Sequence, residues 1–390
     1  MSLSRWSYEE MKIVFVHAGR LTKEKWSDEV VELCKWAQNS DYSDLIEVHI
    51  FWAWTYASEF EQIATTYSWV IMHWFQPRDK LFATRDQSHY TLLPSNFLET
   101  FGLSALEACT YWSVPIGYKK WWLDQFVDTY YAIDTYWWII PCVQHLVKQF
   151  IDRQRMLESR HVQKIAARYT ARRWLYTFQE LSWLNPYQWH TITMISDYWT
   201  REWWIESYIH DVSALLMNNW YTVTSVLWTK TKRSTLQNYW WVVKALWTRS
   251  WKEIVSKHLT THTPDLLRRH SIHRVLWWKA FSATSHTTPQ RYMLHDVWLL
   301  HPRPSRVHME SQLKHSHSLR WRVAEWWVFM SLFSLLKWYS IRASVSSIQT
   351  YCDYVLVPSS FLEHHCVTHW LWTTSNVKTF AHTIETTTEA

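Results

Sequence analysis

Short apolar runs of strand length alternate with helix-period segments through the first half of the chain. Apolar runs bounded by turn-forming residues are typical of strands, and apolar positions three and four apart are typical of helices. This alternation predicts a parallel sheet with helices on both faces. The expected strands are Lys12–His17, Leu45–Phe51, Val70–His73, Tyr90–Pro94, Val114–Gly117 and Tyr131–Ile133, and the expected helices are Asp28–Trp36, Ala57–Thr65, Pro77–Ala83 and Leu103–Thr110.

A second α/β series follows a break at Leu184–Gln188, where an Asn-Pro pair indicates a linker. Helical patterns run up to this break from about Ile139 to Leu181. The pattern therefore predicts two domains, residues 1–182 and 189–390, each long enough to bury its own core. The elements expected in the second domain are the strands Thr191–Ser196, Tyr221–Leu227, Arg291–His295 and Tyr354–Pro358 and the helices Ile205–Asn218 and Phe361–Thr368.

The composition is that of a globular protein without a membrane span. Of 390 residues, 48% are hydrophobic and 19% charged, and no apolar stretch is long enough to cross a bilayer. The N-terminus lacks the pattern of a signal peptide, and the five cysteines are scattered without metal-ligand spacing. We therefore expect a cytoplasmic protein with reduced thiols and no metal.

The formal net charge of +6 is mild for this length. It suits an anionic nucleotide substrate or an acidic membrane surface, so the inner membrane face is the alternative to a free cytoplasmic location. No run of Lys and Arg is dense enough to indicate nucleic-acid binding.

The glycine and tryptophan contents are both anomalous. The chain has 3 glycines and 33 tryptophans, although an α/β protein needs glycine wherever φ must be positive or a backbone must approach a ligand. Tryptophan stands at sites typical of glycine, such as Trp52 and Trp54 after an apolar strand. Trp220 follows a helical pattern, where a residue with positive φ is expected.

One hypothesis accounts for both anomalies. Some bacterial lineages read UGA as glycine, and a translation that reads UGA as tryptophan would place Trp at glycine positions. The alternative is a Trp-rich surface that binds carbohydrate or a partner. The two differ in where Trp should lie, because the first predicts sharp turns and the second predicts flat surfaces.

The most specific segment reads LLPSNFLETFGLSALEA, from Leu92 to Ala108, and is followed by SVPIGYKKWWLDQF, from Ser113 to Phe126. It resembles the donor-site signature of retaining family-4 glycosyltransferases, which have the GT-B fold. The resemblance implies that Glu99 accepts hydrogen bonds from the donor sugar and Glu107 from the ribose hydroxyls.

The backbone between these two glutamates opens a helix. The amides of Phe101, Gly102 and Leu103 can therefore meet the negative charge of a nucleotide. A capped helix with solvated carboxylates is the structural alternative to this binding role.

A basic pair near the N-terminus is the second part of the resemblance. Arg20 and Lys25 lie in GRLTKEKW, which is similar to the family's GRLTKEKG. The resemblance implies that both cations contact the donor diphosphate, and fixed cations would stabilise a leaving diphosphate without a metal. A solvated basic face is the alternative.

The second half resembles the family's N-terminal domain. The segment ITMISDYWTREWWIESYIHDV, from Ile192 to Val212, has Trp203 and Trp204 at the loop where the family has two glycines that approach the donor phosphate. An indole pair at this loop would block that approach. The run YMLHDVW places His295 at a strand end, and the resemblance implies that His295 contacts a sugar hydroxyl, with Asp296 orienting it. A core histidine is the alternative.

The resemblance covers most of the chain, but with the two halves exchanged. It implies two Rossmann-like domains facing across a cleft, with the donor site in residues 1–182 and the acceptor site in residues 189–390. A circular permutation and a fusion of two transferase genes both explain the order.

The implied function is retaining transfer of a sugar from a nucleotide-diphosphate sugar to a glycan, lipid or other acceptor, as in cell-envelope polysaccharide synthesis, without metal or cofactor. The alternatives are a catalytically dead transferase-like protein and a Trp-rich carbohydrate-binding protein.

Overall fold

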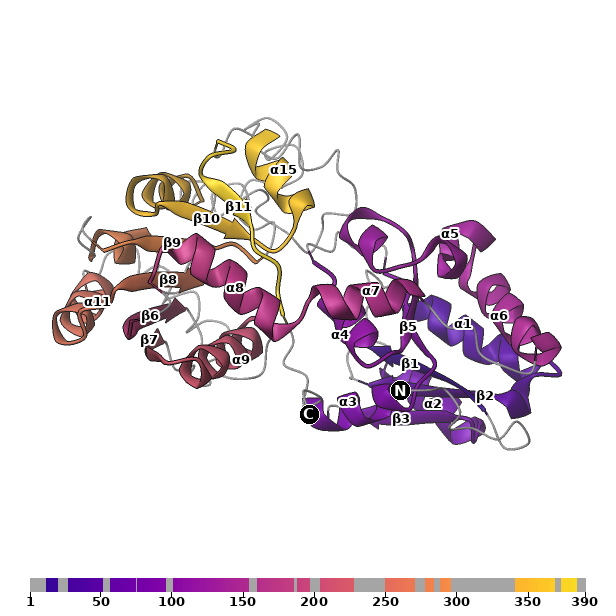
Figure 1. Cartoon of the computed structure of the whole chain (residues 1–390). Coiled ribbons are helices and arrows are strands. Elements are labelled where there is room, and N and C mark those ends of the chain that lie inside the picture. The colour runs from indigo at the N-terminus through magenta and orange to yellow at the C-terminus, as the bar shows by residue number, and fades with distance from the viewer. Residues whose placement is uncertain are drawn as a thin grey trace, which may run out of the picture. The chain divides into compact units, whose positions relative to one another are not determined.

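The chain forms two compact units, Met1–Thr170 and Ala171–Ala390 (Figure 1). The computed structural model describes residues 12–19, 27–51, 57–74, 76–95, 101–153, 160–185, 188–196, 204–227, 250–270, 278–283, 288–295, 341–368 and 373–383, and every structural statement below concerns these residues.

The first unit contains a parallel sheet with the order β3-β2-β1-β4-β5. This is the strand order of a doubly wound Rossmann-type sheet, so the α/β prediction is confirmed. Phe15 lies opposite Tyr90 in the register, and both are buried. The strands are β1 (Ile13–Ala18), β2 (Ile46–Phe51), β3 (Val70–Trp74), β4 (Tyr90–Leu93) and β5 (Val114–Gly117).

Helices lie on both faces of this sheet. On one face, Leu81 of α3 packs on Val16, Ala18 and Phe51. On the other face, the ring of Phe15 stacks on Tyr90, which meets Tyr131. The helices of the first unit are α1 (Ser27–Gln38), α2 (Ala57–Thr66), α3 (Arg78–Asp86), α4 (Leu103–Thr110), α5 (Ile133–Tyr136), α6 (Ile139–Arg153) and α7 (Arg160–Arg168), with 3-10 turns η3 (Ser43–Leu45), η4 (Trp121–Gln125) and η5 (Thr129–Tyr131).

The strand predicted at Tyr131–Ile133 is wrong. The run belongs to η5 and α5, and only Ala132 makes an isolated bridge, to Gly117. Asp128 caps the turn by accepting a hydrogen bond from the backbone N–H of Tyr130 at 3.0 Å. A short buried apolar run fits a strand or a helical turn equally well, and here the cap decides for the turn.

The second unit contains a parallel sheet with the order β11-β10-β9-β8-β6-β7. Counted within the unit, the first strand lies between the second and third, as in flavodoxin-like sheets. The run Pro264–Leu276 resembles a strand of the family-4 glycosyltransferases that ends in His-Ser, and β8 lies in this run, whereas β11 was not among the expected strands. The strands are β6 (His190–Ser196), β7 (Tyr221–Leu227), β8 (Leu266–His270), β9 (Gln290–Met293), β10 (Tyr354–Val357) and β11 (Val377–Thr379).

Two helices cover one face of the second sheet, α8 (Ala171–Ser182) and α9 (Trp204–Asn218). Trp174 and Phe178 of α8 share a core with Ile209 of α9 and Met194 of β6. The opposite face holds η6 (Trp278–Ala283), where Phe281 meets Tyr292 of β9. The other helices are α11 (Ser250–Thr261), α15 (Ser360–Thr368) and the helical residues 341–351.

The predicted boundary after residue 182 differs from the observed division, because α8 packs in the second unit. Its apolar face lies in the core of the second sheet. Arg291 of β9 donates through Nε to the carbonyl of Leu181 at 3.1 Å and pairs with Asp353 at 2.5 Å. A cation that bonds a terminal carbonyl is also stabilised by the negative C-terminal end of the helix dipole. These contacts attach the end of α8 to the sheet.

Every residue other than glycine with positive φ in the described part of the chain is a tryptophan. The φ values are 57° at Trp74, 63° at Trp112, 68° at Trp137, 57° at Trp183 and 71° at Trp220. Left-handed backbone costs an L-residue about 1–2 kcal/mol and favours glycine. All five side chains are more than 40% exposed, so little packing energy offsets this cost.

These tryptophans lie where one element ends and the chain turns to the next. Trp112 follows α4, Trp183 follows α8 and Trp220 follows α9, where a C′ glycine is the usual helix stop. The expectation of positive φ at Trp220 is confirmed. Trp189 and Trp220 meet with their rings 88° apart, so this exposed pair does not form a flat sugar-stacking platform. The conformations support glycine as the residue these positions require.

Trp137→Gly is expected to stabilise the chain by about 1 kcal/mol, because the change removes left-handed strain from a side chain that is 92% exposed. Trp138→Gly is the matched control, since Trp138 is adjacent, 42% exposed and outside the positive-φ set. The control should lose about 0.5–1 kcal/mol through added backbone freedom. Urea unfolding measures both, and a loss of stability in Trp137→Gly equal to that of the control would contradict the conformational argument.

Peptide mass spectrometry of the protein from its own cell determines the residue directly. Glycine is expected at positions 112, 137 and 220. Tryptophan at all three would show that the left-handed tryptophans are real and strained.

Candidate functional site

The carboxyl edge of the first sheet contains the point where the strand order reverses, between β1 and β4. Ligands of doubly wound proteins bind outside the carboxyl ends of the strands at this point. His17, next to the end of β1, donates from Nδ1 to the carbonyl of Leu92 in β4 at 2.9 Å. This bond joins the two strands at the edge where α1 and α4 begin.

The start of α4 lies against the chain that leaves β5. Gly102 has φ 75°, and a Cβ there would lie 2.8 Å from Cδ2 of Leu123, so this position needs glycine. The ring of Phe101 is buried and meets Phe126 and Tyr169 edge-on. Leu103 is the first helical residue. The predicted helix start is confirmed, and its first amides lie at the carboxyl edge.

Glu107 is buried on α4 and contacts two arginines of α3. Oε1 accepts from Arg78 at 3.1 Å, and Oε2 accepts from Arg85 through a short hydrogen bond. Arg85 is fully buried and Glu107 is 7% exposed. The carboxylate therefore neutralises a buried cation and joins α3 to α4, a partnership that the sequence pattern did not predict.

Several predicted site residues lie outside the described residues. These are Arg20, Lys25, Glu99, Trp203 and Asp296. Trp204 begins α9, and its side chain is likewise not described. Their predicted roles stay predictions.

His295 lies in a buried stack of three histidines at the carboxyl edge of the second sheet. One nitrogen of His270, Nδ1, is 2.9 Å from Nε2 of His295, so one ring donates and the other accepts. The ring of His382 stacks on His295 at 5.2 Å, and Tyr208 of α9 packs on both. The side chain of His295 has no exposed surface, so a sugar hydroxyl could reach it only if its neighbours moved.

Two rings of the stack, His270 and His382, are neutral near physiological pH. Burial, with Arg268 beside it, lowers the pKa of His382 to about 3 and that of His270 well below its usual range. In a pair of neutral imidazoles, the protonated nitrogen of one ring can donate to the unprotonated nitrogen of the other. The chemistry of the stack is therefore hydrogen bonding.

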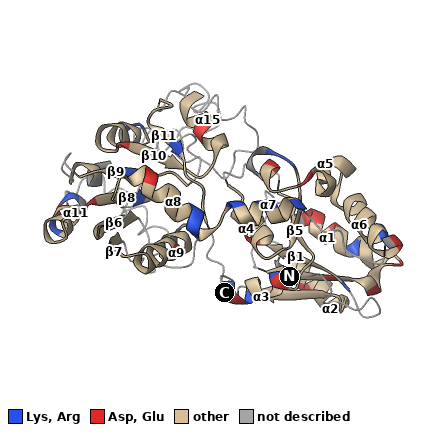
Figure 2. Ribbon diagram, in the orientation of Figure 1, with Lys and Arg blue, Asp and Glu red and all other residues tan. Residues whose placement is uncertain are grey.

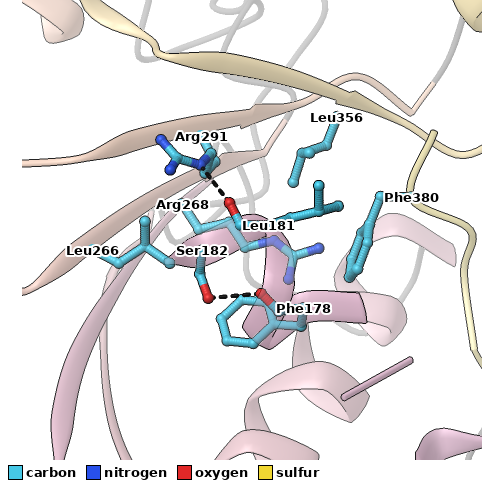
Figure 3. A pocket seen from close by; sticks show the side chains of 8 residues that line it. All are labelled: Phe178, Leu181, Ser182, Leu266, Arg268, Arg291, Leu356 and Phe380. Atoms are coloured by element: carbon cyan, nitrogen blue, oxygen red, sulfur yellow. Dashed lines mark hydrogen bonds between the residues drawn. The ribbon is translucent and has the colours of Figure 1, made fainter. Parts of the chain in front are cut away.

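Arg268 lies beside the stack and is surrounded by aromatic rings. Its guanidinium points between the rings of Phe178 and Phe380, at 5.7 and 5.0 Å from their centroids (Figure 3). One nitrogen donates to the hydroxyl of Tyr208 at 2.9 Å. Cation–π contacts and this hydrogen bond partly offset the cost of burying the charge.

The cavity that Arg268 and Arg291 line is too small for a substrate. Its volume is about 10 Å³, whereas ligand pockets hold on the order of 300–1,000 Å³. A shallow groove of about 240 Å³ lies between α1 and α2, lined by residues such as Val31, Glu59 and Tyr67. Neither feature includes a residue predicted for the site.

The described residues contain no second candidate site based on a charged patch, a metal-ligand cluster or a membrane span. Basic and acidic residues are interspersed over both units (Figure 2). Within the described ranges, no group of three potential metal-ligating side chains is assembled, and no helix has the length and apolarity to cross a bilayer. All five cysteines are buried and unpaired with one another.

Comparisons with known proteins found no matching family model and no matching curated protein. Among solved structures, the catalytic domain of cholesterol-alpha-glucosyltransferase from Helicobacter pylori is similar at 13% identity and TM-score 0.32, over 40% of this chain and 96% of that one. The pneumococcal O-GlcNAc transferase in complex with UDP and GlcNAc is similar at 17% identity and TM-score 0.34, over 44% of this chain and 36% of that one. An Anabaena protein in complex with UDP-glucose has 14% identity and TM-score 0.31, over 40% and 43%. The two parallel sheets establish the α/β fold independently of these low scores.

Glu107→Gln is expected to lower the free energy of unfolding by about 3–5 kcal/mol, because it leaves Arg85 as a buried, unpaired cation. Arg78→Gln is the control, since the side chain of Arg78 is 35% exposed and should cost under about 1 kcal/mol. The double variant Arg85→Met with Glu107→Leu should recover most of the loss. Urea unfolding at pH 7 measures all three, and a Glu107→Gln variant as stable as the wild type would show that the pair is not structural.

Proposed function

We propose that the protein is a glycosyltransferase that takes its sugar from a nucleotide-diphosphate sugar. One observation carries this proposal: the segment from Leu92 to Ala108, which resembles a donor-site signature, starts a helix at the strand-order reversal of a Rossmann-type sheet. The amides at that helix start suit the negative charge of a diphosphate.

The proposed donor site uses the first unit. Arg20 and Lys25 contact the diphosphate, Glu99 the sugar, and Phe101, Gly102 and Leu103 supply amides. Glu107 is compatible with a ribose contact as well as its two arginines, because a carboxylate offers about four lone-pair sites. The position of Arg78 and Arg85 beside it fixes the direction of its carboxylate.

The proposed reaction breaks the bond between the anomeric carbon and the diphosphate oxygen. A hydroxyl of a glycan, lipid or other acceptor, bound by the second unit, forms the new bond with retention, and its proton leaves with the diphosphate. The two basic residues stabilise the departing charge in place of a metal. His295 is proposed to contact a sugar hydroxyl once its buried ring is uncovered, and the loop at Trp203 and Trp204 borders the phosphate. A peripheral location at the cytoplasmic membrane face and a role in cell-envelope polysaccharide synthesis belong to the same proposal.

Calorimetric titration with UDP-, ADP- and GDP-sugars tests donor binding. One should bind, and Arg20→Gln should weaken that binding by about 10–100-fold through loss of a charged hydrogen bond. Arg172→Gln, an exposed change on α8, is the control and should bind like the wild type.

The titration is run on the chain as written and on a version with glycine at positions 203 and 204. Binding by the glycine version alone supports donor approach at that loop. Binding of free sugars without nucleotides by the written chain would instead favour the carbohydrate-binding alternative, and the anomeric configuration of a product by NMR tests retention.

A further inference from the structure

A buried acid–phenol pair joins the first turn of α1 to the exit of β5. The hydroxyl of Tyr118 donates to Oε1 of Glu29 at 2.6 Å. Both side chains are 6% exposed. Glu29 is the third residue of α1, and Tyr118 directly follows Gly117, the last residue of β5. The pair therefore lies at the carboxyl edge of the first sheet.

The two oxygens of the Glu29 carboxyl differ in their surroundings. Oε1 receives the Tyr118 hydroxyl, whereas Oε2 is buried without a hydrogen-bond partner among the described residues. An ionised carboxylate needs donors on both oxygens to offset its loss of water. With a single donor, the neutral acid form of Glu29 is close in free energy to the ionised form.

The charged groups around the pair come from three elements. Asp28 precedes Glu29 in α1, Lys120 lies with Nζ 4.7 Å from the ring centroid of Tyr118, and Asp134 of α5 acts on Tyr118. Burial is the largest effect and raises the pKa of Glu29 to about 7. The Tyr118 hydrogen bond lowers this pKa, Asp28 raises it and Lys120 lowers it. Burial thus outweighs the helix N-terminus, which favours the ion.

The pair lies at the same sheet edge as the proposed donor site. Tyr118 follows β5, and the chain continues to Leu123 and Phe126, which pack on Gly102 at the start of α4. α1 and α4 follow β1 and β4, the strands on either side of the order reversal. Glu29 in the first turn of α1 and Gly102 at the start of α4 therefore border the same edge.

We propose that Glu29 is a proton-controlled charge that sets the pH range in which the first unit binds an anionic diphosphate. This inference rests on the proposed function. With a neutral Glu29 carboxyl, the positive ends of α1 and α4 face the diphosphate with one negative charge fewer at that edge. Loss of the proton adds a negative charge to that edge and weakens diphosphate binding by Coulomb repulsion. Tyr118 positions the carboxyl and takes no part in the transfer.

Glu29→Gln keeps the shape of the carboxyl without its charge and tests the proposal. UDP, ADP and GDP are titrated calorimetrically at pH 6, 7 and 8.5 against wild type and variant. The ratio of the two dissociation constants is compared, so that titration of the nucleotide itself cancels. Between the lowest and the highest pH, nucleotide binding by the wild type should weaken by about fivefold relative to binding by Glu29→Gln.

Asp28→Asn is the matched control, because Asp28 is the adjacent, exposed carboxylate of the same helical turn. It should keep a pH-dependent loss of nucleotide binding, with the midpoint shifted to slightly lower pH because Asp28 raises the pKa of Glu29. Titration of the Glu29 carboxyl carbon by NMR in the unliganded protein is a second readout, and an apparent pKa of about 7 is expected.

The outcomes separate the inference from the function on which it rests. Nucleotide binding with the same pH dependence in wild type and Glu29→Gln overturns the inference alone, and so does ionisation of Glu29 in the ordinary range. Absence of nucleotide binding in every protein at every pH overturns the proposed function together with the inference.

Discussion

A parallel sheet requires the chain to reverse direction after every helix, and this constraint governs both units. A common way to make this reversal is a residue that leaves the helix in left-handed backbone, where a Cβ atom is strained. At Trp112, Trp183 and Trp220 these reversals occur with the required φ but with an indole in place of a hydrogen atom. The architecture is thus preserved while the residue type suited to its turns is missing, which is why the tryptophans bear on every functional conclusion.

At Gly102 and Gly117 the chain has kept glycine, and neighbouring atoms leave no room for a Cβ atom. A Cβ at Gly117 would lie 2.7 Å from the carbonyl oxygen of Leu93, and at Gly102 it would meet Leu123. Both contacts are at the carboxyl edge of the first sheet, where backbone, helix start and the β5 exit approach closely. That close approach brings the amides of α4 and the carboxyl of Glu29 to one edge, and it is the physical basis for proposing anion binding there.

Buried charges give each unit a different internal organisation. In the first unit, the buried cation of Arg85 is paired with the carboxylate of Glu107, and this ion pair joins two helices. In the second, Arg268 relies on aromatic rings and one hydroxyl, and burial, with the charge of Arg268 as the smaller effect, lowers the pKa of His270 and His382. The first arrangement orients a carboxylate near the proposed donor site, and in the second the fully buried His295 packs on Tyr208, which accepts a hydrogen bond from Arg268.

The sequence by itself determined the α/β class, the start of α4 at Leu103 and most strand positions, because periodicity and helix starts depend on neighbouring residues. It also identified Trp220 as a position of positive φ. Only the tertiary structure decided that α8 packs in the second unit, that Tyr131 lies in a turn, that Glu107 meets Arg85 and that Glu29 meets Tyr118. These contacts join residues distant in the chain, and their energy comes from burial and charge pairing that exist only after the sheets have formed.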